Sequence, residues 1–411
     1  MRSPIAHTPS AAGASLWSAF LPLLPFMATV FVGLFATAMA LPVLPRHVHE
    51  TLGQGTVMVG LVMGCQYAAA LFARPWAGGL ADARGARSGA LAGFVVALGV
   101  AGLYLASVPF ADAPGVALSL VIAGRLLTGF AESFVVTSTM AWALARLGPA
   151  HAGKVIGWIG MAVFASLGAA APVGTAVHAH FGFAGVAVAI FVVAVLGLAG
   201  TRCIAGVAPL GGQRLPFYRV LGVVKLAGVG LTLSSLGFAM LTAFAVLLFA
   251  QRGWGGGALA LTSMGAGFIV GRLLFGHLPD RLGGARVALA CVIAEAVGLA
   301  LIWLAPHPAL AWLGAALTGG GYGLAFQGFG VEAVRRAPAS SRGSAMGAYI
   351  IFQDFAMGLA PVRGGALAAT AGLESLYLAR AVGASPPGMA RDSASRNMQI
   401  CATCVPVVMC A

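Results

Sequence analysis

Charged residues are scarce in this sequence. Lysine and arginine number 23 and aspartate and glutamate number 10, so only 8% of the 411 residues are charged, against about 25% in a soluble domain. This shortage excludes an ordinary soluble globular protein, a disordered chain and a fibrous chain. We also do not expect nucleic acid as a partner, because the basic residues behind the net charge of +13 follow another pattern, described below.

Cysteine pairs and catalytic motifs are also lacking. Cys65 and Cys291 lie within apolar runs, so no disulfide framework is expected. Cys401 and Cys404 have C-x-x-C spacing, but neither a second pair nor a histidine stands nearby, and we expect no metal site. The chain has no H-E-x-x-H, G-x-S-x-G or P-loop motif. We therefore expect no enzyme activity, no cofactor and no direct use of ATP.

Apolar residues dominate instead, at 60% of the chain. That amount suffices for about twelve membrane-spanning helices of roughly 20 residues each. The spans must be helical, because backbone groups in lipid have to bond within their own segment. The apolar runs predict helices near 17–41, 56–80, 87–108, 115–145, 154–178, 181–201, 219–250, 258–279, 285–305, 308–333 and 343–371, with a short twelfth near 373–385.

The basic residues predict how the helices are oriented. Sixteen of them fall in loops on one side and two, Arg46 and Arg252, on the other. By the positive-inside rule both termini face the cytoplasm, provided that the twelfth helix spans the membrane. The polar start of the chain and the long first span argue against a cleavable signal peptide. We expect a monomeric, multi-pass protein of the bacterial inner membrane, surrounded by lipid.

The second half of the sequence repeats landmarks of the first. The segment ARPWAGGLADARGAR (73–87) returns as GRLLFGHLPDRLGGAR (271–286) at an offset of 198, so that Arg74 matches Arg272. A Leu-Thr-Gly triplet at 127–129 returns at 317–319, an offset of 190. Parallel repeats of this kind form two six-helix bundles related by a pseudo-two-fold axis along the membrane normal. The predicted parts are a first bundle (1–201), a basic linker (202–218), a second bundle (219–385) and an atypical tail (386–411).

The repeated loops resemble sequence signatures of a known protein family. GGLADARGAR (78–87) and its second copy (276–286) resemble the G-x-L-a-D-r-x-G-r-r loop signature of the major facilitator superfamily. RLLTG (125–129) is similar to that superfamily's R-x-x-q-G signature in the fourth helix. GAAAPVG (168–174) resembles the fifth-helix Gly-Pro signature of proton-driven exporters. GRLLTGFAESFV, GKVIGW and LPDRLGG resemble the bacterial arabinose-efflux-permease-like branch, and the likeness covers roughly residues 15–380.

The resemblance implies roles for the loop motifs and for two prolines. It implies that the motif residues latch the two bundles together on the inner side, and we expect the motif glycines to let helix ends approach closely. The alternative is a solvated loop whose charges serve only orientation. Pro172 and Pro361 are expected to bend the fifth and eleventh helices, the alternative being a static bend or a helix end. The latch residues implied are Gly78, Asp82, Arg84, Arg87, Gly276, Asp280, Arg281 and Arg286.

Four charged residues lie within predicted spans: Arg125, Glu132, Glu295 and Asp354. Each costs about 2.5–3.5 kcal/mol at mid-helix on insertion scales, which favours a functional reason for its presence. The repeat sets Ala315 opposite Arg125, Tyr322 opposite Glu132 and Phe164 opposite Asp354, so these charges occur in one half only.

This asymmetry favours a role in transport over a role in the scaffold. We expect Asp354 or Glu132 to carry a proton, with Arg125 as its electrostatic partner or as a substrate contact. The alternative is a static salt bridge between helices. Glu295 is expected to be a peripheral or packing residue.

These features predict a secondary active transporter that exports small sugar-like or drug-like molecules in exchange for protons, by alternating access. Proton-coupled uptake is one alternative. A transport-inactive sensor or scaffold is another, because the pattern fails after Ala384, where SPPGMARDSASRN stands in place of a full twelfth helix.

Overall fold

The computed structural model describes residues 21–148, 152–207, 217–278, 282, 284–336 and 342–371. These residues form long α-helices joined by short turns, and no strand occurs among them. The short elements are η1 (Leu21–Leu23), α3 (Leu44–Arg46), the π-helical turn η2 (His47–Thr51) and η3 (Val108–Phe110). The long helices are α2 (Leu24–Ala38), α4 (Thr56–Arg84), α5 (Ala86–Ser107), α6 (Pro114–Leu147), α7 (Ala152–Arg202), α8 (Phe217–Gln251), α9 (Gly257–Phe275), α11 (Gly284–Leu304), α12 (Pro308–Arg336) and α13 (Arg342–Ala371).

The predicted spans correspond to these helices. Nine stretches among the described residues are long and apolar enough to cross a membrane, and α13 is a further long helix. The two predicted spans 154–178 and 181–201 both lie in the long helix α7. Its helical backbone is interrupted at Gly182, where φ is 64°. A positive φ favours glycine, because a Cβ would be strained against the residue's own backbone. The predicted twelfth span and the tail lie outside the described residues.

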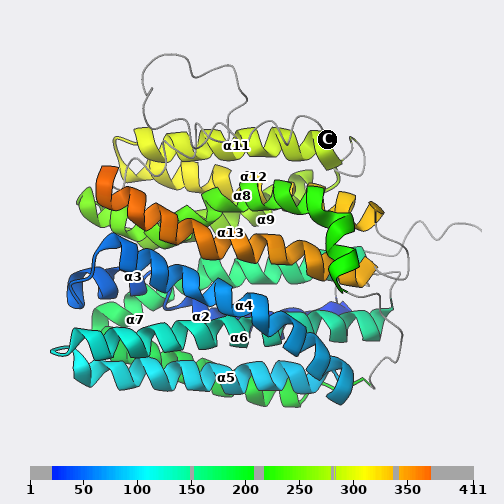
Figure 1. The fold of residues 1–411 in the computed structure, drawn as a ribbon, viewed down its shortest axis with the longest axis horizontal. Coiled ribbons are helices and arrows are strands. Elements are labelled where there is room, and N and C mark those ends of the chain that lie inside the picture. Colours follow the sequence, from blue (N-terminus) through cyan, green and yellow to red (C-terminus); the bar gives the residue numbers. More distant parts are fainter. Residues whose placement is uncertain are drawn as a thin grey trace, which may run out of the picture.

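The helices lie side by side along their length (Figure 1). In this view the N-terminal helices fill the lower part and the C-terminal helices the upper part. Helix α5 packs against α6 and α7, and α11 packs against α12. The two halves meet where α4 packs against α13 and where α7 packs against α9.

Small residues let the helices approach closely within each half. A Cβ added to Gly298 would lie 2.6 Å from the carbonyl oxygen of Gly314, where α11 meets α12. Such small-residue contacts are typical of helix packing in lipid, where no hydrophobic force drives helices together. Large apolar side chains instead cover the outside, as Phe72 and Trp76 do at 73% and 67% exposure. The protein is an all-α, multi-pass membrane protein.

Candidate functional site

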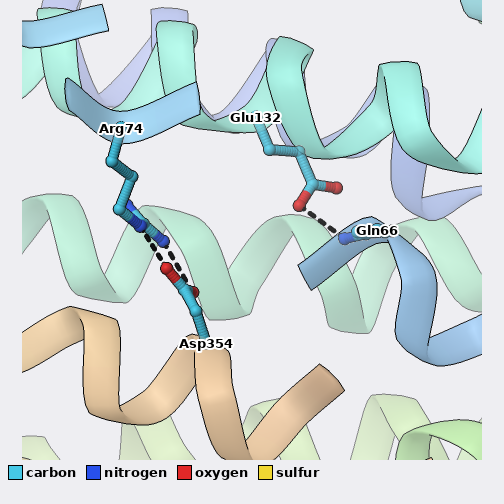
Figure 2. A network of polar contacts seen from close by, with 4 residues as sticks. All are labelled: Gln66, Arg74, Glu132 and Asp354. Carbon is cyan, nitrogen blue, oxygen red and sulfur yellow. Dashed lines mark hydrogen bonds and ion pairs between the residues drawn. The ribbon is translucent and has the colours of Figure 1, made fainter. Parts of the chain in front are cut away.

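An ion pair joins the two halves of the molecule. Arg74 on α4 donates from Nε and Nη2 to the carboxylate of Asp354 on α13, and the Nη2–Oδ1 distance is 2.8 Å (Figure 2). Asp354 is only 2% exposed. The guanidinium meets the carboxylate side by side, the geometry that makes such pairs strong and directional. Removing either charge would leave the other one buried and unpaired.

Glu132 lies near this pair, on α6, and is held by neutral donors. Gln66 Nε2 donates to one carboxylate oxygen at 2.7 Å, and Thr37 Oγ1 donates to the other at 2.9 Å. Figure 2 shows Gln66 and Arg74 reaching from α4 toward Glu132 and Asp354. We call Gln66, Arg74, Glu132 and Asp354 the polar cluster. Gln66 and Thr37 escaped the sequence analysis as partners of Glu132, because only the fold brings α2 and α4 beside α6.

Arg125 interacts electrostatically with Glu132, as expected of a partner of that carboxylate, but its hydrogen bonds go elsewhere. It is 0% exposed and donates to the carbonyl oxygens of Val62 at 3.2 Å and Met63 at 3.4 Å. No carboxylate among the described residues accepts a hydrogen bond from it. The ion-pair partner of Asp354 is therefore Arg74, and Arg125 ties α6 to the backbone of α4. Arg74 belongs to the repeated segment 73–87 and lies inside the predicted span 56–80. That intramembrane position is the signal that could have identified it as a partner for a buried carboxylate.

Aromatic residues occupy the equivalent region of the other interface. Phe164 on α7 stacks on Phe268 of α9, with ring centroids 3.5 Å apart. Phe238 on α8 stacks on Tyr322 of α12, with centroids 4.7 Å apart. We call these four residues the aromatic cluster. Phe164 is the repeat equivalent of Asp354, and Tyr322 is the equivalent of Glu132, so the repeat exchanges carboxylates for aromatic rings.

The two interfaces between the halves make contact at one pair of repeat-related positions. At α4–α13, a Cβ on Gly64 would lie 2.3 Å from the carbonyl oxygen of Gly358. Adding 198 to 64 gives 262, and subtracting 190 from 358 gives 168. At α7–α9, Thr262 Oγ1 indeed donates to Gly168 O at 2.7 Å. The structure thus shows at atomic detail the internal repeat that the sequence indicated.

The prolines expected to bend helices lie inside α7 and α13. In a regular helix the carbonyl of Gly168 would accept from residue 172, but Pro172 has no N–H. Thr262, from the other half, donates to that carbonyl instead. The backbone break within α7 occurs at Gly182, ten residues beyond Pro172. Pro361 packs against α4, where its carbonyl oxygen lies 2.1 Å from the position of a Cβ on Gly60.

The residues of the predicted latch are only partly described. Arg84 and Arg286 are exposed. Arg87 donates to the carbonyl of Arg202, within the N-terminal half. The side chain of Asp82, and all of Asp280 and Arg281, lie outside the described residues. The latch therefore stays a prediction.

The motif glycines differ from expectation at one position. No described atom lies within 4 Å of where a Cβ would stand on Gly78, so the close helix approach expected there is absent from the described part of the chain. The carbonyl of Gly276 accepts a hydrogen bond from Gln327 Nε2 at 2.9 Å, which ties α12 to the end of α9.

Glu295 lies inside the C-terminal half. It is 3% exposed on α11 and accepts a hydrogen bond from Ser234 Oγ of α8 at 2.8 Å. The expected packing role fits this position, whereas a peripheral one does not. Glu295 is not part of the polar cluster.

A cavity of about 230 Å³ lies among η2, α5, η3 and α7. His47 and His178 both line it, and the ring of His47 stacks on Phe183 with centroids 4.1 Å apart. Burial lowers the pKa of His47 to about 4, and His178 adds to the shift. The cavity belongs to the N-terminal half and is separate from the polar cluster.

Comparisons with known proteins agree with this architecture. Residues 26–361 match the family description "Major Facilitator Superfamily". An MFS-type transporter of Pseudomonas aeruginosa (strain LESB58) is 38% identical over 378 residues, which cover 92% of this chain and 94% of the relative. An MFS-type transporter of Burkholderia mallei (strain SAVP1) is 36% identical over 371 residues, covering 90% of this chain and 91% of the relative.

Solved structures share the fold at low sequence identity. The nucleoside transporter NupG superposes with a TM-score of 0.69 at 15% identity, covering 88% of this chain and 96% of NupG. The human organic anion transporter MFSD10 superposes with a TM-score of 0.63 at 15% identity, covering 89% of this chain and 97% of MFSD10. Together with the repeated bundles and the ion pair that joins them, these matches show that the chain belongs to the major facilitator superfamily and is a membrane transporter.

Proposed function

We propose that the protein is a proton-coupled exporter of small sugar-like or drug-like molecules, in which Asp354 carries the proton. The observation that supports this most directly is the ion pair between Arg74 and Asp354. Among the described residues it is the one ion pair that connects the two halves, since the other, Arg46–Glu50, joins α3 to the adjacent η2.

The mechanism follows from the energetics of a buried pair. A proton on Asp354 neutralises the carboxylate and removes its attraction for Arg74. Breaking one side of such a pair costs about 3–5 kcal/mol, because the remaining charge is left without a partner. Protonation therefore weakens the contact between α4 and α13 and favours a rocking motion of one half against the other.

Glu132 is a second carboxylate in reach of the same cluster. Its partners, Gln66 and Thr37, are neutral, so it can gain or lose a proton without breaking an ion pair. We assign to it a supporting role, in which it passes a proton or binds a polar group of the substrate. The hydrogen bond from Gln66 connects it to α4, which also carries Arg74.

The direction of transport is part of the proposal. Export is supported by the likeness of residues 168–174 to the Gly-Pro signature of proton-driven exporters. The loop charges predict that the Thr56 end of α4 faces outward and that the Arg84 end faces the cytoplasm of a bacterial cell. The halves pack backbone to backbone near the Thr56 end, where Thr56 Oγ1 donates to Gly365 O at 2.9 Å. In this orientation the conformation is closed on the outside.

Proteoliposomes with an imposed pH gradient of either polarity test the proposal. Transport of labelled arabinose, further sugars and a panel of drugs is followed for the wild type, Asp354→Asn and Glu132→Gln. The matched control is Asp112→Asn, which removes an exposed carboxylate in the turn before α6. Movement against the proton flow supports exchange, and movement with it supports uptake. If Asp354→Asn and Glu132→Gln both keep gradient-driven transport, the assignment of the proton carrier is wrong.

A further inference from the structure

Arg272 is the repeat equivalent of Arg74, but its surroundings differ. It lies on α9 and faces α7, in the other half of the molecule. A Cβ added to Gly157 would lie 2.6 Å from Nη2 of Arg272, so the guanidinium occupies space that only a glycine leaves open. The side chain therefore points into the interface between the halves and not toward lipid.

No acidic residue of the described chain balances this charge. The residue that corresponds to Asp354 is Phe164, and the described ion pairs do not include Arg272. An arginine within a span is costly and normally pairs with an anion or with backbone carbonyls. Arg74 meets this requirement with Asp354, whereas Arg272 has no such partner among the described residues.

The aromatic cluster adjoins Arg272 on the same helix face. Phe268 precedes Arg272 by four residues on α9, which is about one helical turn, or about 6 Å. Phe268 is stacked on Phe164 of α7. A flat apolar group beside aromatic rings and an anionic group on the guanidinium would together satisfy this surface, because arginine binds carboxylates in a planar, two-pronged manner.

We propose that Arg272 binds the anionic group of the substrate, and that the substrates of this transporter include aromatic carboxylates. This inference rests on the proposed transport function, because it places the substrate between the halves. The polar cluster then handles the proton at α4–α13, and the Arg272 surface recognises the substrate at α7–α9. The same guanidinium could instead hold a lipid phosphate, and the experiment separates these two anions.

Binding to the purified full-length protein tests the proposal without any gradient. Three probes share one ring system: 2-naphthoate (anion), 2-naphthamide (neutral) and 2-naphthylmethylammonium (cation). Calorimetric titration in nanodiscs of zwitterionic phosphatidylcholine should show at least about tenfold tighter binding of the anion than of the amide, which is about 1.4 kcal/mol. Arg272→Gln should abolish this preference, and Arg272→Lys should keep part of it. Arg46→Gln, which removes an exposed arginine at the end of α3, is the matched control and should keep it fully.

A second pair of variants checks the comparison with Arg74. Phe164→Asp restores the carboxylate that the repeat lacks and should remove the preference for the anion, by competing for Arg272. Phe164→Asn removes the same ring without adding charge, so it should weaken binding of all three probes while the anion stays favoured over the amide. Thermal melting of each variant confirms that it is folded before it is titrated.

The results that overturn the proposal are definite. Equal binding of the three probes, or binding of none, contradicts it, as does an unchanged preference in Arg272→Gln. Loss of naphthoate binding when phosphatidylglycerol is added to the nanodiscs identifies lipid phosphate as the ligand and also contradicts it. Because no pH gradient is used, a failure of proton coupling leaves this binding result intact, so the two proposals fail separately.

Discussion

The interfaces α4–α13 and α7–α9 occupy equivalent positions in the two halves, yet they are built from different chemistry. The first carries the ion pair Arg74–Asp354. The second carries the stacked rings of Phe164 and Phe268. An ion pair disappears when its carboxylate gains a proton, whereas stacked rings are unaffected. The comparison teaches that two interfaces related by pseudo-symmetry can differ in their response to protons: a contact made by an ion pair depends on protonation, whereas a contact made by stacked rings does not.

The largest expected effect comes from removing the carboxylate. Asp354→Asn should reduce gradient-driven transport to the level of protein-free liposomes, because the charge that a proton must neutralise is gone. Phe164→Leu, at the equivalent position of α7, should keep the dependence on the pH gradient. Transport assays in proteoliposomes check both variants. Gradient-dependent transport by Asp354→Asn would remove the functional contrast between the interfaces.

Removing the arginine should mainly affect stability. Arg74→Gln should lower the free energy of unfolding by about 3–5 kcal/mol, because it leaves the Asp354 carboxylate buried without its partner. The double variant Arg74→Gln, Asp354→Asn should recover most of that loss. Arg272→Gln, which breaks no ion pair among the described residues, should change stability much less. Denaturant titrations in detergent provide the values, and a double variant as unstable as the single one would contradict the explanation.

Close backbone contact should make the α4–α13 interface less tolerant of added volume. Gly64→Ala would set a Cβ 2.3 Å from the carbonyl oxygen of Gly358, whereas Gly168→Ala would set one 3.5 Å from that of Thr262. The first should cost about 1–3 kcal/mol through overpacking and the second much less. Melting temperatures of the two variants test this order. Equal losses would show that the interfaces are packed alike.

The smallest effect is expected from the hydrogen bond across α7–α9. Thr262→Val keeps the volume but removes the donor to Gly168 O, at a cost of about 1 kcal/mol. The carbonyl concerned lacks its regular helical donor because position 172 is proline. Replacing Pro172 with alanine in the Thr262→Val background should restore a donor and part of the stability. If it restores nothing, Thr262 does not compensate for the proline.

Much of the fold was predictable because its signals are local. Apolar runs of about 20 residues indicate spans directly, since lipid leaves helices as the only way to satisfy the backbone. Eleven predicted spans correspond to observed helices. Once the structure supplies the contact between Gly64 and Gly358, the repeat offsets of 198 and 190 relate it to the contact between Thr262 and Gly168.

The pairing within the candidate site was less predictable. Glu132 and Asp354 stood out as costly charges within apolar spans, and the structure brings both into the polar cluster. Their partners did not stand out. Arg125 was expected as the electrostatic partner of a carboxylate because it shares a helix face with Glu132; it does interact electrostatically with Glu132, but its hydrogen bonds go to the carbonyls of Val62 and Met63.

The sequence by itself determined the membrane class, the two-fold repeat and the set of intramembrane charges, because each follows from composition or spacing along one chain. Only the tertiary structure decided which charges meet. Arg74 and Asp354 are 280 residues apart, and their contact depends on how α4 packs on α13. Likewise, only the packing of α7 on α9 shows that Arg272 faces Gly157 where Arg74 faces a carboxylate. Helix periodicity places residues on a face, but the partner of that face is set by the fold.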